Sequence, residues 1–233
     1  MKTLDKAIDK VDINNEEKID FKISVSDFDI TESYFTDEDE IDNKTIKYIE
    51  REIRNSFEYR TYIQFLKEEL DLTRCSLMKN IDIKTTPVSL EFHHFPLTLY
   101  EITEAVGKSM VDGLTKDEAV SGFDIAEKVV EEHYKHNIGL VPLTKTIHDM
   151  AHNGTIFIPI DAVNGNYQEF INDYRKHIEP ATLDKVEAVK AYNNSQTAKD
   201  YNQEKLKKRI VNYDVEYKDH KKDEEGGNTN GII

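Results

Sequence analysis

Cysteine, basic residues and long apolar runs are all scarce in this chain of 233 residues. The single cysteine, Cys75, means that no disulfide can form within the chain, which fits a reducing compartment. The first residues, Met1 to Lys6, lack the apolar core of a signal peptide, and no apolar run is long enough to span a bilayer. We therefore expect a soluble cytoplasmic protein.

Basic residues are outnumbered, with 31 Lys and Arg against 46 Asp and Glu, and the formal net charge is −15. A surface of this charge repels nucleic acid at long range, so DNA or RNA binding would need a local basic patch. The main basic cluster is Lys205 to Arg209. A serine or cysteine hydrolase has no support, because Cys75 and the serines lack the motif of an activated nucleophile. Cys75 is predicted to be a small buried side chain instead.

The hydrophobic pattern predicts a mostly helical α+β chain with charged ends. The parts are an acidic N-terminal arm (1–43), a helical region (44–87), a strand–helix unit (88–160) with a helical insertion (98–136), C-terminal helices (161–212) and a disordered tail (213–233). The arm is densest in acid at 36–42. It is either a solvated, loosely ordered segment or a strip that mimics the charge of DNA or docks onto a basic partner.

Helix signals are strongest in the first half of the chain. Ile46, Ile49 and Ile53 recur at helical spacing, and a phase shift near 55–56 predicts one long helix or two joined helices. Capping boxes at 98–101 and 115–118 predict one helix from 99 to about 110 and another from about 124 to 136. Alternation predicts a strand at 88–95.

The second half of the chain alternates short elements. Residues 140–143 form an apolar piece that suits one arm of a hairpin, and a helix is expected at 144–152, ended by Asn153-Gly154. β-Branched and aromatic residues at 155–160 predict a strand. An amphipathic helix at 167–178 is broken by Pro180, and a long polar helix is expected from 181 to about 210.

Four of the eight histidines fall at two points of the chain. His93 and His94 end the predicted strand, while His148 and His152 lie four residues apart and so share one face of the predicted helix. Imidazole is a common metal ligand and the side chain best suited to proton transfer near neutral pH. Strand alternation places Glu91 and His93 on one face and His94 on the other. A metal ligand and a general base at adjacent positions would therefore need a kink or strand end, which Pro96 can supply.

The sequence Glu91-Phe92-His93-His94, followed by the two helical histidines, resembles the HNH (ββα-metal, His-Me finger) endonuclease family of phage type over residues 89–159. The resemblance implies a ββα-metal hairpin–helix unit that holds one divalent metal ion (Zn, Mg, Mn or Ni). His93, His148 and His152 would be the ligands, and His94 would be the general base that activates water. Glu91 matches an accompanying acid. The implied function is a DNA endonuclease that hydrolyses phosphodiester bonds, in the host cytoplasm if a phage encodes it.

Two departures from that family stand out. Gly139 occupies the position of its usual asparagine, and Asn137, two residues earlier, can orient the base only if the hairpin carries a bulge or a longer turn. The span between His94 and Asn137 is also far longer than the family's minimal motif.

Two other interpretations of the same residues therefore stay open. One is an inactive, metal-stabilised interaction or structural protein whose acidic arm binds a basic partner. The other is a set of histidines that only hydrogen-bond in a core. His133 and His136 form a further pair near a helix C-terminus, where surface histidines are favoured over a second metal site.

Overall fold

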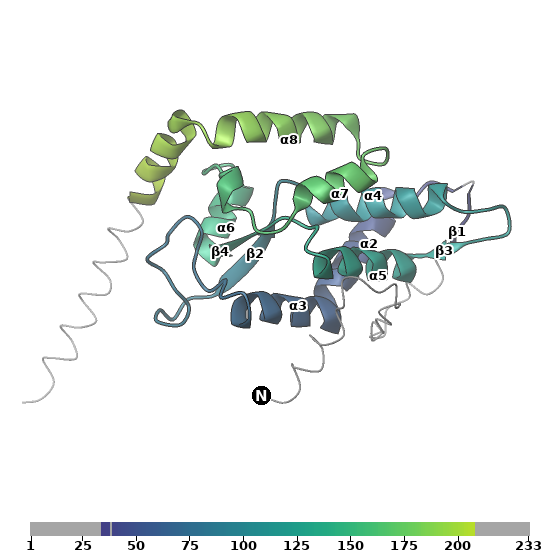
Figure 1. The fold of residues 1–233 in the computed structure, drawn as a ribbon, viewed down its shortest axis with the longest axis horizontal. Coiled ribbons are helices and arrows are strands. Elements are labelled where there is room, and N and C mark those ends of the chain that lie inside the picture. The colour runs from purple at the N-terminus through teal and green to yellow at the C-terminus, as the bar shows by residue number, and fades with distance from the viewer. Residues whose placement is uncertain (1–33, 38, 208–233) are drawn as a thin grey trace, which may run out of the picture.

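The structure is a computed structural model that describes residues 34–37 and 39–207 (Figure 1). The elements in chain order are β1 (Tyr34–Phe35), α2 (Asn43–Asn55), α3 (Phe57–Glu68), β2 (Leu90–His94), α4 (Leu99–Asp112), β3 (Val120–Ser121), α5 (Gly122–Tyr134), β4 (Leu140–Thr144), α6 (Lys145–His152), the 3-10 turn η1 (Ile160–Ala162), α7 (Tyr167–Tyr174) and α8 (Pro180–Asn193). The expected mostly helical α+β class is confirmed. The predicted disordered tail and most of the acidic arm lie outside the described residues.

Helices α2, α4 and α5 pack together around one apolar core (Figure 1). The spacing of Ile46, Ile49 and Ile53 puts them on one face of α2, and all three are fully buried. Ser56 is extended and separates α2 from α3, and its hydroxyl accepts a hydrogen bond from the Tyr59 backbone N–H. The phase shift therefore marks two joined helices, the second of which begins with its own cap.

The last residues of the predicted acidic arm are part of this fold. Tyr34–Phe35 pairs antiparallel with β3. Asp42 is the N-cap of α2, and its carboxylate accepts hydrogen bonds from the backbone N–H groups of Lys44 and Thr45. Acidic side chains at 39 and 42 therefore serve local hydrogen bonds as well as surface charge.

Strands β2 and β4 form an antiparallel pair, and α6 follows β4 directly. The register pairs His93 with Val141 and His94 with Leu140. The long connection between the two strands holds α4 and α5. Figure 1 shows β2, β4 and α6 grouped at one end of the molecule, with α3 beneath them and α8 above.

Capping side chains explain why the predicted start of α4 is correct and why the second predicted capping box does not begin α5. Thr98 and Glu101 form the predicted capping box of α4. The second predicted box, at 115–118, is only a turn, in which Glu118 accepts a hydrogen bond from the Thr115 backbone N–H at 2.8 Å. Helix α5 starts later, with a capping box formed by Ser121 and Asp124.

The strand predicted at 155–160 is wrong. This segment has no partner strand among the described residues, and its backbone is held by side-chain amides instead. Asn202 accepts from the Phe157 backbone N–H at 2.9 Å and donates to its carbonyl at 2.6 Å, and Asn193 donates to the Ile158 carbonyl. The backbone N–H and carbonyl groups of this extended segment therefore pair with amide side chains, whereas in a sheet they would pair with a second strand.

The single long helix predicted from 181 is also wrong. Pro180 begins α8 at its first turn, where proline needs no N–H partner, and Asn194-Ser195 interrupts the helix before helical backbone resumes at 196–207. Asn194 at this break donates to Asp161 and accepts from the Ile160 backbone N–H. The interruption therefore ties the C-terminal helices to η1.

Candidate metal centre

Three histidine side chains from two elements converge at the junction of β2 and α6. His93 lies on the partly exposed face of β2, and His148 and His152 lie on consecutive turns of α6. His93 and His148 are half-buried and His152 is exposed, so the cluster lies at the surface. One potential ligand nitrogen from each residue can be chosen so that all three lie within 4.8 Å of one another.

The separations suit a small tetrahedral cation. The Nε2 atoms of His148 and His152 are 3.2 Å apart, and two nitrogens bound at about 2.05 Å in a tetrahedron are roughly 3.3 Å apart. The ring centroids are 4.5 to 5.0 Å apart, against about 5 Å for imidazoles that share one such ion. All three nitrogens lie within 4.8 Å of one another, so the set closes to tetrahedral spacing with ring movements of at most about 1.5 Å.

Glu91 lies behind this cluster and holds one of its rings. Its Oε2 accepts a hydrogen bond from Nδ1 of His148 at 2.8 Å. Since Nδ1 then carries the proton of the neutral ring, the lone pair of His148 lies on Nε2, the atom that faces His152. A carboxylate in this position fixes both the tautomer and the orientation of a metal-binding histidine.

The cluster favours neutral imidazoles, the form that binds a metal. Burial, followed by the nearby His148 and His152, lowers the pKa of His93 to about 4. Burial and then His152 lower the pKa of His148, and the charge of Glu91 opposes them. Near neutral pH both rings are therefore uncharged.

His94 lies on the opposite face of the ribbon from His93. Its side chain is 5% exposed, and its Nε2 lies 3.0 Å from Nε2 of His133 on α5. His133 donates from Nδ1 to the Val129 carbonyl at 2.7 Å, so its Nε2 accepts from His94 when both rings are neutral. Burial lowers the pKa of both histidines, that of His133 to about 4, which keeps them neutral. The predicted division of His93 and His94 between two faces is what the structure shows: β2 pairs regularly through His94 and ends there, but this strand end leaves His94 on the buried face.

Asn137 does not orient His94. Its side-chain amide donates to Oε2 of Glu132 at 2.9 Å, and Tyr174 donates to the other carboxylate oxygen at 3.2 Å. Gly139 cannot be replaced by an asparagine without moving the backbone, because a Cβ there would lie 2.2 Å from the Phe95 carbonyl oxygen. The structure therefore brings together Glu91, His93, His148 and His152, and it separates His94 and Asn137 from them.

His133 was not identified from the sequence as the partner of His94. Helical spacing predicted that His133 faces inward, although the HxxH pair was also interpreted as surface histidines, and His133 is fully buried against Tyr59 and Tyr62. Its inward position on α5 was readable from the spacing of Ile125, Val129 and Val130, which are all buried. No local signal connects it to a strand 39 residues away.

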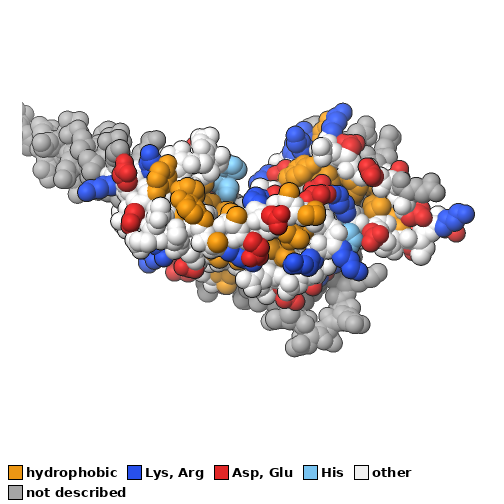
Figure 2. Space-filling view, turned by 90° about the horizontal axis from the view of Figure 1, so that it is seen from above, with side chains coloured by type: hydrophobic (Ala, Val, Ile, Leu, Met, Phe, Trp, Pro, Cys, Tyr) orange, Lys and Arg blue, Asp and Glu red, His pale blue; other side chains and the backbone are white. Residues whose placement is uncertain are grey.

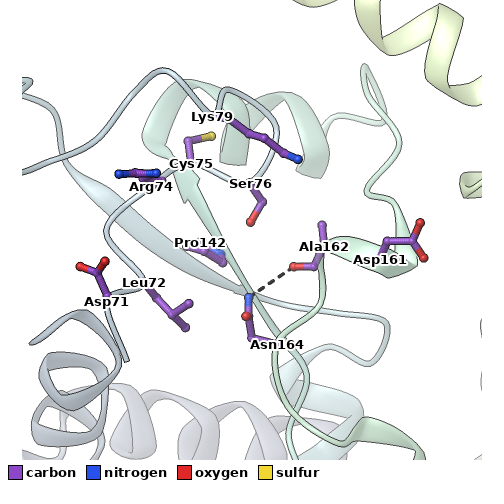
Figure 3. Close-up of a pocket in the computed structure, with 10 residues that line it drawn as sticks. All are labelled: Asp71, Leu72, Arg74, Cys75, Ser76, Lys79, Pro142, Asp161, Ala162 and Asn164. Atoms are coloured by element: carbon purple, nitrogen blue, oxygen red, sulfur yellow. Dashed lines mark hydrogen bonds between the residues drawn. The ribbon is translucent and has the colours of Figure 1, made fainter. Parts of the chain in front are cut away.

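A separate open pocket of about 280 Å³ lies beside β4 (Figure 3). It is lined by Asp71, Leu72, Arg74, Cys75, Ser76, Lys79, Pro142, Asp161, Ala162 and Asn164. Cys75 is fully buried, as predicted, and no histidine lines the pocket to activate it. The pocket therefore offers no histidine that could activate Cys75 or Ser76 as a hydrolase nucleophile.

These features define a mostly helical α+β protein with a three-histidine cluster where a strand pair meets a helix. The profile of the bacteriophage G278-like virion protein family matches residues 1–221, so the chain belongs to that family. No curated protein and no solved structure matches the chain. Within the described residues, no helix combines the length and apolarity needed to cross a membrane.

The family overturns the nuclease interpretation. A match along nearly the whole chain to a virion protein family, and not to HNH endonucleases, shows that the resemblance of residues 89–159 to HNH enzymes was misleading. The assignments as endonuclease and hydrolase are therefore wrong, whereas the expected phage origin is confirmed. Family membership gives no support to metal binding either.

Proposed function

We propose that this protein is a structural component of the phage particle and not an enzyme that acts on DNA. The observation that carries this proposal is the match to a virion protein family over residues 1–221, which includes every residue of the histidine cluster. This proposal corresponds to the second interpretation of the sequence, that of an inactive interaction or structural protein.

The geometry around His94 supports the same conclusion. A general base must reach the water that it activates, within hydrogen-bond distance. His94 is buried, and its Nε2 is engaged by His133 on the face of β2 that points away from His148 and His152. Its contacts with His133 and Tyr59 are those of a core residue that joins β2 to α3 and α5.

We further propose that β2, β4 and α6 act together as a compact ββα unit within this component. The two strands pair along their whole length, and α6 contacts both of them. Such a unit can present a fixed surface to neighbouring subunits without undergoing a catalytic cycle.

The distribution of acidic and basic side chains indicates which partners such a component could bind. Residues 1–43 carry 14 acidic against 5 basic side chains, which gives −9 of the net −15. Acidic and basic side chains are interspersed on the face seen in Figure 2, which presents no single-sign patch. A basic protein partner for the acidic arm fits this distribution better than DNA does. Binding to a basic protein, binding to DNA and a location in the host cytoplasm all stay predictions. Residues 1–33 of the arm lie outside the described part of the chain.

Quantitative mass spectrometry of gradient-purified phage particles tests the structural role. We expect this protein at a reproducible copy number per particle that survives washing with high salt and treatment with added nuclease. Particles from a phage that lacks its gene should be defective or missing a component, and the gene supplied from a plasmid should restore them. Abundant protein in the infected-cell lysate together with its absence from washed particles would overturn the proposal.

A further inference from the structure

We propose that His93, His148 and His152 bind one zinc-class divalent cation that clips α6 to β2, with Glu91 as the outer carboxylate that orients His148. This inference stands on the side-chain geometry and does not depend on where the protein lies in the particle. The ion has a structural role, because the only adjacent imidazole that the sequence offered as a base is buried on the other face.

The three rings form a site rather than a satisfied cluster. His148 and His152 point Nε2 at each other across 3.2 Å, and Nδ1 of His148 is already used by Glu91. Without a cation, His152 must supply the one proton that lies between these two nitrogens. A cation uses both lone pairs at once, and the third ring, from β2, lies within reach on the same side.

The arrangement of the chain favours this convergence. The i, i+4 spacing puts His148 and His152 on one face of α6, and strand alternation puts Glu91 and His93 on the face of β2 that α6 covers. Ile147 and Met150, buried on another side of α6, fix the rotation of the helix and so the direction of its histidines. The ligands are therefore positioned by packing before any ion binds.

Three imidazole ligands select the class of metal. Zinc and its neighbours in the transition series bind imidazole nitrogen at about 2.0–2.1 Å, whereas magnesium and calcium take oxygen ligands. Three protein ligands leave one tetrahedral position, which water can fill because His152 is exposed to solvent. Of the metals that the sequence left open, magnesium is the one that this donor set disfavours most.

The carboxylate of Glu91 is a positioning group rather than a ligand in this arrangement. Its hydrogen bond to Nδ1 of His148 makes that ring a better donor at Nε2, and loss of such a partner typically weakens metal affinity by about 10–100-fold. Loss of one of the three histidine ligands should weaken metal affinity by at least about the same factor.

Metal binding by the purified full-length chain tests the proposal, with Zn²⁺ as the probe and Mg²⁺ as the comparison. After removal of metal with a chelator, reloading and gel filtration, elemental analysis should find about one zinc per wild-type chain, and competition with a chromogenic chelator gives the affinity. His152→Ala should weaken zinc binding by more than about 100-fold, and Glu91→Gln by about 10–100-fold with the stoichiometry unchanged. His177→Ala is the matched control, because His177 pairs with Asp112 outside the cluster.

Folding is separable from binding in these variants. His152 is exposed, so the metal-free His152→Ala protein should melt at the same temperature as metal-free wild type. Zinc should raise the melting temperature of wild type and of His177→Ala but not that of His152→Ala. The proposal is overturned if wild type holds no more zinc than His152→Ala, or if Mg²⁺ binds this site as tightly as Zn²⁺. Neither result would change the copy number measured in particles, so the two proposals fail separately.

Discussion

Gly139 is the residue at which this fold should tolerate a side chain least. It lies just before β4, and its carbonyl accepts a hydrogen bond from the Phe95 backbone N–H at 3.0 Å, one step beyond the β2–β4 ladder. A Cβ added to Gly139 would lie 2.2 Å from the Phe95 carbonyl oxygen and 2.9 Å from Cγ1 of Val163. The first of these contacts is with backbone, so it cannot be relieved by rotating a side chain.

The cost of Gly139→Ala follows from these contacts. Overpacking of a close contact costs about 1–3 kcal/mol, and separating the two backbones adds about 0.5–1.5 kcal/mol for the weakened hydrogen bond. We expect a loss of about 2–4 kcal/mol in the free energy of unfolding, which corresponds to a fall of roughly 5–15 °C in melting temperature for a domain of this size.

Urea unfolding followed by circular dichroism measures this loss. Gly113→Ala is the matched control: Gly113 ends α4 with φ −83°, and its nearest contact to an added Cβ is 3.4 Å, so its effect should stay within about 0.5 kcal/mol. If Gly139→Ala were as stable as Gly113→Ala, the close approach of residues 95 and 139 would not be a rigid feature of the fold, and the reasoning would be refuted.

Three further substitutions test the packing and hydrogen bonds of the fold. Ile53→Ala, which empties a fully buried site on α2, should cost about 2–5 kcal/mol in urea unfolding, whereas Lys47→Ala on the exposed face of the same helix should be nearly neutral. Asn202→Ala leaves the Phe157 N–H and carbonyl without their partner, so we expect a loss of about 1–3 kcal/mol and faster hydrogen exchange at 155–159, and unchanged exchange would contradict the role given to this amide. Glu132→Ala removes a buried carboxylate to which Lys135, Asn137 and Tyr174 donate, and a melting temperature equal to that of wild type would show that these hydrogen bonds contribute nothing.

The parts of the fold that the sequence predicts well are those with a local cause. The start of α4 is determined by the side chains of Thr98 and Glu101, and the end of α6 is followed by Gly154, which takes a positive φ of 64°. The apolar faces of α2 and α5 follow from spacing alone, because a helix with one apolar face can bury only that face.

The failures have non-local causes. The capping pattern at 115–118 is as good locally as the one at 121–124, and the second begins the helix because the strand pairing of Val120–Ser121 with β1 fixes the chain there. The residues at 155–160 have strand propensity, but the neighbours that the fold supplies are amide side chains of distant helices. Propensity describes a residue, whereas a strand also needs a partner.

The side chains that meet at the candidate site were predictable, whereas the chemistry of His94 was not. Strand alternation puts Glu91 and His93 on one face, and helical spacing puts His148 and His152 on one face. That the two pairs meet was expected only from the resemblance to HNH enzymes, and the structure does bring them together. The role of His94 was not predictable, because it depends on which helix covers the second face of β2, and His133 on α5 supplies that contact. A short motif therefore defined a cluster of side chains and misled about the chemistry.

The structure of α6 shows what the proposed metal clip would add. It has only eight residues, and within the described structure its N-cap, Thr144, makes no side-chain capping hydrogen bond. A helix of this length has almost no stability of its own, so α6 depends on the two apolar side chains that it buries and on the strand beside it. An ion held at 100 times its dissociation constant would add about 2.7 kcal/mol to the folded state, comparable to one further buried side chain. A particle component has to persist outside the cell, and the proposed metal clip would stabilise α6, a helix of eight residues that buries two apolar side chains.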